Sequence, residues 1–209
     1  ATHAGISVGE DGATHQCNED IALMRTIPGM TVINPADAVE ASLAVRAAFE
    51  QDGPVYMRFG RLAVPVVFDS TYKFEIGKGV ELREGTDVTV IATGLMVKEA
   101  LEAHDLLKDE GINARIINMA TIKPIDRDII IKAAKETGAI VTAEEHSVIG
   151  GLGSAVSEVV TETVPVPVVK LGVYDTFGHS GSAVKLLDEF GLRAVNIVEK
   201  AKAAIALKR

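Results

Sequence analysis

Cysteine is almost absent from this 209-residue sequence, and tryptophan is wholly absent. The one cysteine, Cys17, has no second thiol in the sequence with which to form a disulfide, which indicates a reducing compartment. Cys17 itself is expected to be a small buried side chain. No apolar run reaches the length of a membrane span, and the N-terminus lacks the basic-then-apolar layout of a signal peptide. We therefore expect a cytoplasmic protein.

Runs of lysine and arginine are absent too. The sequence has 21 basic and 29 acidic side chains, and its formal net charge is −8. We therefore expect neither a nucleic acid nor a membrane as a partner. Hydrophobic residues make up 47% of the sequence, which at this length is enough for one large domain or two small ones with a real core.

Strand and helix patterns alternate along the first third of the sequence. The apolar and capping patterns predict helices at 18–27 and 37–51 and strands at 30–34 and 54–60. Residues 61–75 break this rhythm and have no helical period, so they are predicted to form an extended connection. A strand–helix–strand order of this kind favours a parallel sheet.

The remaining residues repeat the alternation. Strands are predicted at 79–84 (an edge strand), 87–93, 114–120, 139–144 and 166–173, and helices at 95–110, at 126–138, from about 151, from about 182 and from 194 to the end. The predicted fold class is α/β, with a partial parallel α/β domain at 1–66, a linker at 67–76 and a Rossmann-like domain at 77–209.

The most polar stretch lies at the start of the chain. Residues 2–16, THAGISVGEDGATHQ, contain two histidines, an adjacent glutamate and aspartate, and three glycines. Loops of this composition either are solvated turns or bind a ligand close to the backbone and move protons near neutral pH. The two histidines are twelve residues apart and fit no standard zinc pattern, so no metal site is expected.

Four features between residues 104 and 179 are expected to have structural roles. GGLGSA, at 150–155, could bind an anion at a helix N-terminus, but a close-packed helix start is favoured. His104 lies among the apolar positions of its helix and is expected to be packed and hydrogen-bonded. His146 and His179 are predicted to lie in loops and to be structural or interfacial.

The opening stretch, together with the following IPGMTVINPADAVEA, closely resembles the pyrimidine-binding domain of transketolases. The resemblance is closest to the C-terminal section of the split, two-subunit enzymes. AEEHSVIGGLGSAVSE and DTFGHSG resemble the transketolase C-terminal domain, so the resemblance covers essentially the whole chain. His3 before the AG pair, and the Ser-Val pair before GEDG, favour transketolase over the related deoxyxylulose-phosphate synthase.

The resemblance implies the side chains that contact the substrate. His3 would contact the phosphate of a sugar phosphate, and Asp11 would hydrogen-bond a hydroxyl near the reacting carbon. VYMRFGR falls where the family has a phosphate-binding arginine, so Arg58 would grip the phosphate, with Arg61 as a weaker candidate.

The resemblance also implies a cofactor and a reaction. Transketolases use thiamine diphosphate and a divalent metal, here expected to be Mg²⁺, to transfer a two-carbon ketol unit between sugar phosphates. His15 would lie near the aminopyrimidine of the cofactor and assist proton transfer, and Gln16 would lie beside it. The cofactor's diphosphate and the metal would be held mainly by other parts of the enzyme.

The family's activating glutamate lies upstream of the THAG residues in family members. The sequence starts at Ala1 without an initiator methionine, so we expect that Ala1 is not the biological start and that this chain alone is inactive. The expected partner is an N-terminal transketolase subunit carrying the diphosphate domain, and self-association is expected as well.

Two alternatives remain open at this point. One is a deoxyxylulose-phosphate synthase or a 2-oxoacid dehydrogenase β-type subunit, which share the cofactor and the C-terminal motifs. The other is a noncatalytic assembly or regulatory domain that keeps the fold. The intact set of His3, Asp11, His15 and Arg58 favours an enzyme.

Overall fold

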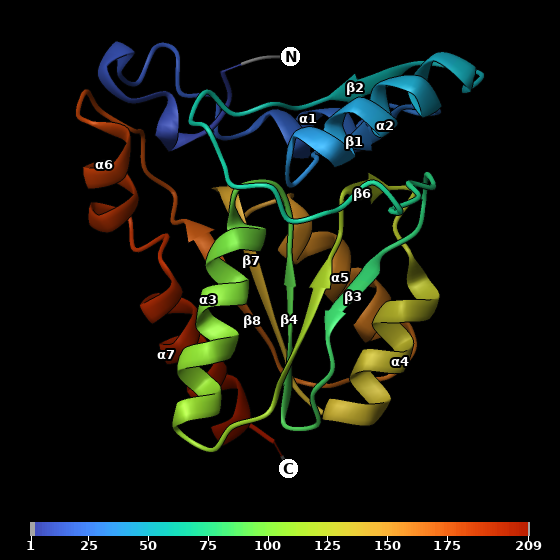
Figure 1. Cartoon of the computed structure of the whole chain (residues 1–209), viewed down its shortest axis with the longest axis vertical. Coiled ribbons are helices and arrows are strands. Elements are labelled where there is room, and N and C mark those ends of the chain that lie inside the picture. Colours follow the sequence, from blue (N-terminus) through green and yellow to red (C-terminus); the bar gives the residue numbers. More distant parts are fainter. Residues whose placement is uncertain (1–2, 209) are drawn as a thin grey trace.

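Two sheets lie one above the other in the computed structural model, which describes residues 3–208 (Figure 1). The smaller sheet contains β1 (Thr31–Ile33), β2 (Val55–Met57) and β6 (Thr121–Lys123), in the order β2-β1-β6. β1 pairs parallel with β2 and antiparallel with β6. The strand–helix–strand order predicted for this part is confirmed.

Two helices accompany the smaller sheet, α1 (Asp20–Thr26) and α2 (Ala38–Glu50). Asp37 caps α2, because its Oδ1 accepts the backbone N–H of Glu40 at 2.8 Å. Both helices were predicted from their capping and apolar residues.

The larger sheet has five strands in the order β3-β5-β4-β7-β8. They are β3 (Val80–Arg83), β4 (Val88–Ala92), β5 (Ala114–Asn118), β7 (Ile140–Ser147) and β8 (Val168–Val173). The predicted edge strand is confirmed, since β3 pairs antiparallel with β5 at one margin of an otherwise parallel sheet. The α/β fold class is confirmed with it.

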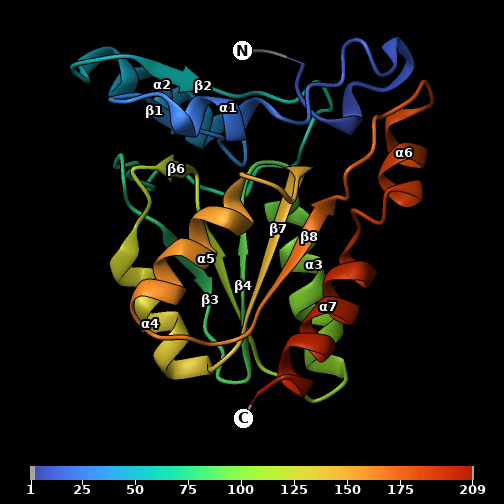
Figure 2. The same ribbon diagram turned by 180° about the vertical axis from the view of Figure 1, so that it is seen from behind.

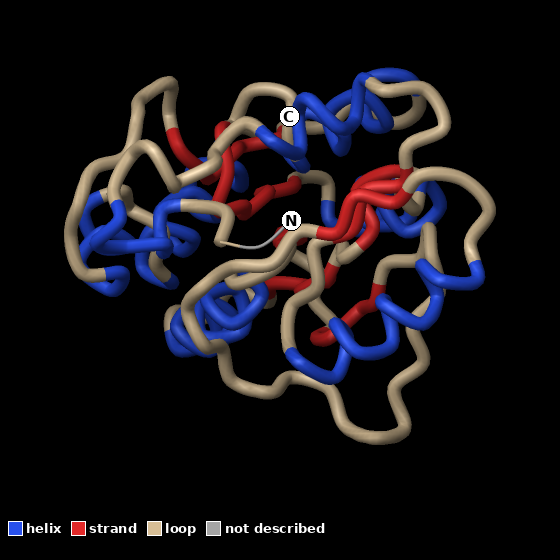
Figure 3. The backbone as a smooth tube through the Cα atoms, turned by 90° about the horizontal axis from the view of Figure 1, so that it is seen from above, coloured by secondary structure: helices blue, strands red, loops and turns tan. Residues whose placement is uncertain are grey.

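Helices cover both faces of the larger sheet (Figures 1 and 2). α3 (Met96–Asp109) and α7 (Ala194–Ala206) pack on one face, and α4 (Arg127–Thr137) and α5 (Leu152–Glu162) pack on the other. Seen from above, helices flank the strands on both sides (Figure 3). Each face buries its own apolar cluster, so the sheet is apolar on both sides, as a parallel sheet requires.

β6 joins the two halves of the sequence, and the sequence patterns did not predict it. It follows β5 after two residues, and then pairs with β1 in the smaller sheet rather than extending the larger one. Its three residues are too few to show a period of their own. The pairing fixes the opening third of the chain above the larger sheet.

The connection between β2 and β3, residues 58–79, contains no helix or strand, in agreement with the predicted break. It is anchored all the same. Oδ2 of Asp37 accepts the backbone N–H groups of Val67 and Phe68 at 2.7 and 2.8 Å, so the side chain that caps α2 also holds the connection.

Candidate active site at the opening loop

The two ends of the opening loop, residues 3–19, lie close together. The backbone N–H of Gly5 donates to the carbonyl of Cys17 at 2.9 Å, and that of Ala4 donates to the carbonyl of Phe59 at 3.1 Å. Between these stems lies a short 3₁₀ helix, η1 (Ile6–Asp11), which is broken by Gly9 at φ 85°. Positive φ at this position is the reason that the loop needs glycine there.

Three of the side chains implied by the motif face solvent. His3, Asp11 and His15 are all exposed. Oδ2 of Asp11 lies 2.5 Å from Nη1 of Arg61, which also donates to the carbonyl of Val8 at 3.2 Å. The pair is half-exposed, with 44% of the Arg61 side chain and 49% of the Asp11 side chain open to solvent. The loop therefore presents an anion and two imidazoles on its surface, and Arg61 from the connection after β2 adds a cation beside them.

Arg58 lies in a different environment. Its side chain is only 2% exposed, and its Nε donates to Oδ2 of Asp20 at 2.8 Å. Its Nη2 donates to the carbonyls of Cys17 and Glu145 at 3.1 and 2.9 Å. Burial opposes ionisation of Asp20, but Arg58 beside it keeps the pKa of that carboxyl below its usual range. The structure thus brings Asp11 together with Arg61 and places Arg58 beneath the loop.

Gln16 is also turned inward, and it braces the loop. Its Nε2 lies within 3.2 Å of the carbonyls of Ile6, Gly9 and His179, so one amide connects the start and the break of η1 to the segment after β8. Its Oε1 is buried and has no hydrogen-bond partner among the described residues.

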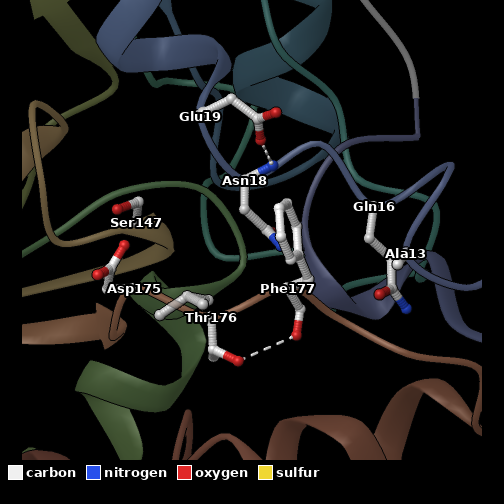
Figure 4. Close-up of a pocket in the computed structure, with 9 residues that line it drawn as sticks. Ala13, Gln16, Asn18, Glu19, Ser147, Asp175, Thr176 and Phe177 are labelled. Carbon is white, nitrogen blue, oxygen red and sulfur yellow. Dashed lines mark hydrogen bonds between the residues drawn. The ribbon is translucent and has the colours of Figure 1, made fainter.

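An open hollow of about 340 Å³ lies between the loop and the segment that follows β8 (Figure 4). Gln16, Asn18 and Glu19 line it from the loop, and Asp175 and Phe177 line it from the opposite side. The hollow opens beside the buried carboxamide of Gln16.

Two glutamates at the end of β7 support this region, and the sequence patterns did not single them out as site residues. Oε1 of Glu145 accepts the backbone N–H of Ser7 at 2.5 Å. Glu144 accepts the N–H groups of Leu152 and Gly153 at 2.7 and 2.8 Å. Burial raises the pKa of Glu144 to about 7, although both N–H donors favour the carboxylate. No sequence signal pointed to them, because their partners are backbone groups in other parts of the chain.

The GGLGSA segment is a close-packed helix start, as favoured from the sequence. The N-terminus of α5 already has an anion, the carboxylate of Glu144. A Cβ added to Gly151 would lie 2.0 Å from Oε2 of Glu144, so glycine is what lets the carboxylate approach. In this structure the chain's own side chain fills the position that an external anion would take.

The predictions for the remaining histidines and for the cysteine were partly confirmed and partly wrong. His104 is packed and hydrogen-bonded to the carbonyl of Ala114 at 2.9 Å, as predicted. His179 lies in a loop, 3.2 Å from a carboxylate oxygen of Glu189. The loop prediction for His146 was wrong, since β7 continues through it and buries it completely. The prediction that Cys17 is buried was also wrong, because this residue of the loop stem is exposed.

Two features are absent from the described residues. Residues 3–208 contain no group of three or more His, Cys, Asp or Glu side chains placed to hold a metal ion. None of the helices in that range is both long enough and apolar enough to cross a lipid bilayer.

Comparisons with known proteins give the family. Residues 1–66 match the transketolase pyrimidine-binding domain, and residues 77–197 match the transketolase C-terminal domain. A putative transketolase C-terminal section from Methanocaldococcus jannaschii is 48% identical over 203 residues, which are 96% of this chain and 63% of that protein. A 6-deoxy-6-sulfo-D-fructose transketolase subunit from a Clostridium species is 45% identical, over 94% of this chain and 61% of that protein.

Solved structures agree with these matches. A split-gene transketolase described as an inactive β4 tetramer superposes with a TM-score of 0.94 at 52% identity, covering 100% of this chain and 67% of that one. A transketolase from Pichia stipitis in complex with sedoheptulose 7-phosphate superposes with a TM-score of 0.80 at 26% identity, covering 99% and 29%. This chain thus spans less than two thirds of the length of the curated relatives named above. On these matches the chain belongs to the transketolase family and corresponds to its pyrimidine-binding and C-terminal domains.

Proposed function

We propose that this chain is the C-terminal section of a split transketolase, and that the opening loop forms one side of an active site for ketol transfer between sugar phosphates. The observation that carries the proposal is the separation of roles within the loop. His3, Asp11 and His15 face outward, whereas Gln16 and Arg58 hold the loop from beneath. Family membership supplies the class of reaction.

Of the two arginines, Arg61 is the better phosphate contact. Arg58 is buried, and its Nε and Nη2 donate to Asp20 and to two carbonyls, whereas Arg61 is reachable from solvent. A phosphate suits the planar fork of a guanidinium and would compete with Asp11 for it. The freed carboxylate of Asp11 would then accept a hydrogen bond from a sugar hydroxyl.

The described residues of this chain suit the pyrimidine end of thiamine diphosphate and not its diphosphate end. When bound, it supplies the carbanion chemistry of ketol transfer. His15 offers an exposed imidazole that can hold or move a proton at the pyrimidine end, and Gln16 keeps that part of the loop in place. The described residues offer no cluster for the divalent metal that accompanies a diphosphate, so we propose that a partner subunit holds this end.

The first test is a ketol-transfer assay with thiamine diphosphate, Mg²⁺ and pentose phosphates. We expect activity when the chain, in its full-length form, is combined with a subunit carrying the diphosphate domain, and none from the chain alone. Activity from the chain alone would contradict the need for a partner. Silence in both mixtures would contradict ketol transfer and favour an assembly role.

The second test addresses the phosphate role of Arg61. In the active mixture, Arg61→Ala is expected to lower kcat/KM for a phosphorylated sugar by about 10- to 100-fold, and to affect the same sugar without phosphate far less. Arg127→Ala, which removes an exposed arginine at the start of α4, is the matched control. Equal losses on both sugars would contradict the phosphate role of Arg61.

A deoxyxylulose-phosphate synthase is a second candidate function. A protein of that name from Heliobacterium modesticaldum is 42% identical over 97% of this chain, which covers 32% of that protein. The same mixture given pyruvate and glyceraldehyde 3-phosphate distinguishes the two, because only the synthase reaction releases carbon dioxide from pyruvate.

A further inference from the structure

The carboxylate of Glu145, which belongs to the larger sheet, reaches the backbone of the opening loop. Oε1 of Glu145 accepts the N–H of Ser7 at 2.5 Å, and the two residues are 3% and 1% exposed. Ser7 lies in the first turn of η1, which ends at Asp11. The carboxylate of Asp11, which is proposed to bind a sugar hydroxyl, therefore lies on a helix that Glu145 of the larger sheet holds in place.

The backbone of the same glutamate holds the other end of the loop. The carbonyl of Glu145 accepts Nη2 of Arg58 at 2.9 Å, and the same nitrogen donates to the carbonyl of Cys17 at 3.1 Å. That Cys17 carbonyl also accepts the N–H of Gly5. One residue of β7 thus holds the loop at two places, at Ser7 of η1 with its side chain and at the Cys17 stem through Arg58.

Gly5 shows how closely the carboxylate is packed against the loop. A Cβ added there would lie 2.4 Å from Cδ and 2.5 Å from Oε1 of Glu145. Gly5 also has φ 88°, a conformation that other residues rarely adopt. The loop approaches Glu145 at a position where only glycine leaves room for it.

From these contacts we infer that Glu145 is a positioning residue for the active-site loop, acting on Ser7 directly and on Cys17 through Arg58. The C-terminal domain then has a part in the site without touching the substrate. What the loop does once positioned rests on the proposed function, but the positioning itself does not. By the same contacts we infer that Arg58 positions the loop, and the phosphate contact is proposed for Arg61.

Amide hydrogen exchange of the whole chain tests the positioning without any need for activity. Loss of a buried charge-assisted hydrogen bond in Glu145→Ala is expected to speed exchange within residues 3–19 by about 10- to 100-fold, with β4 and α7 unchanged. Glu145→Gln keeps an oxygen that can accept from Ser7 and should recover most of the protection.

Glu99→Ala is the matched control. Glu99, in α3, is also a buried carboxylate that accepts a backbone N–H, that of Ala194 at the start of α7, at 2.8 Å. We expect this variant to change exchange near residue 194 and to leave residues 3–19 as they are. Wild-type exchange of 3–19 in Glu145→Ala, or equal acceleration throughout the chain, would overturn the inference.

A kinetic test follows in the active mixture. Displacement of the loop in Glu145→Ala is expected to lower kcat/KM for a pentose phosphate by about 10- to 100-fold, and Glu145→Gln should restore most of it. Full activity in Glu145→Ala would overturn the inference. A wild-type mixture with no ketol transfer would instead contradict the proposed function, and the exchange result would still stand.

Discussion

Arg58 and Asp20 form a buried ion pair, with Nε of the arginine 2.8 Å from Oδ2 of the aspartate and side chains only 2% and 5% exposed. The same oxygen accepts the hydroxyl of Tyr56 at 2.7 Å. The pair connects the end of β2 to the start of α1, directly beneath the opening loop. A cation at this depth depends on its partner for stability.

Removal of Asp20 should therefore be costly. Asp20→Ala leaves the Arg58 charge buried without its ion-pair partner and hydrogen-bonded to carbonyl oxygens, and the free energy of unfolding is expected to fall by about 3–5 kcal/mol. Urea denaturation followed by circular dichroism measures it. Glu162→Ala is the control, because it breaks the exposed pair between Arg127 and Glu162 and should change stability by less than about 1 kcal/mol. A loss in Asp20→Ala as small as the control's would show that the pair does not stabilise the fold.

His146 predicts a pH dependence of stability. Burial, with a smaller contribution from Arg58, lowers the pKa of His146 to about 4, although Asp20 nearby opposes the shift. The unfolded histidine titrates near 6.5, so the unfolded state binds more protons between pH 4 and 6.5. The stability that the neutral imidazole contributes is therefore complete above pH 6.5 and is lost as the pH falls toward 4.

Comparison with His146→Gln isolates this effect. Between pH 7.5 and pH 5 the wild type is expected to lose about 2 kcal/mol more stability than the variant, measured by urea denaturation at each pH. Glu144 and Glu145, whose pKa values are raised, are present in both proteins, so the difference between the two curves reports His146. Parallel curves would mean that the folded histidine titrates normally.

Most of the helices and strands were predicted from local sequence signals, because a cap or an apolar run lies within a few residues of the element that it defines. Asp37 and Gly111 mark the ends of their helices as local chemistry requires, and the apolar runs of β4 and β5 are buried on both faces. β6 was missed because its partner strand, β1, lies about ninety residues earlier in the chain.

The site was predicted only as far as the motif reaches. The motif named the exposed side chains of the loop, but two arginines three residues apart gave no indication of which one faces inward. The depth of Arg58 depends on Asp20 and on a carbonyl from β7, and these are tertiary contacts. Glu145 carried no signal at all, because its partner is a backbone N–H group 138 residues away.

Asp37 should have two separable effects on stability. Asp37→Ser keeps an oxygen that can cap Glu40 but does not reach Val67 and Phe68, whereas Asp37→Ala loses all three acceptor contacts. We expect stability to fall by about 1–2 kcal/mol in the serine variant and by about 2–4 kcal/mol in the alanine variant. Urea denaturation ranks the three proteins. Equal stability of the two variants would mean that the cap contributes nothing, and a serine variant as stable as the wild type would mean the same of the two linker contacts.

Gly151 should tolerate no side chain, for a purely steric reason. Its φ of −81° suits any residue, but a Cβ would lie 2.0 Å from Oε2 of Glu144 and 2.7 Å from Nδ1 of His146. Gly151→Ala forces the buried carboxylate away from the N-terminus of α5, and it is expected to cost about 2–4 kcal/mol in urea denaturation.

Gly111→Ala gives the opposite case and serves as the control. Gly111 has φ 78°, and among the described residues nothing lies within 4 Å of the added Cβ, so only backbone strain of about 1–2 kcal/mol is expected. A double variant tests the steric explanation directly. Glu144→Ala removes the carboxylate that lies nearest to the Gly151→Ala methyl and leaves Nδ1 of His146 as the remaining close contact. The double variant should therefore be less destabilised than the sum of the two single variants. Additive losses would show that the clash with Glu144 is not the reason that glycine occupies this position.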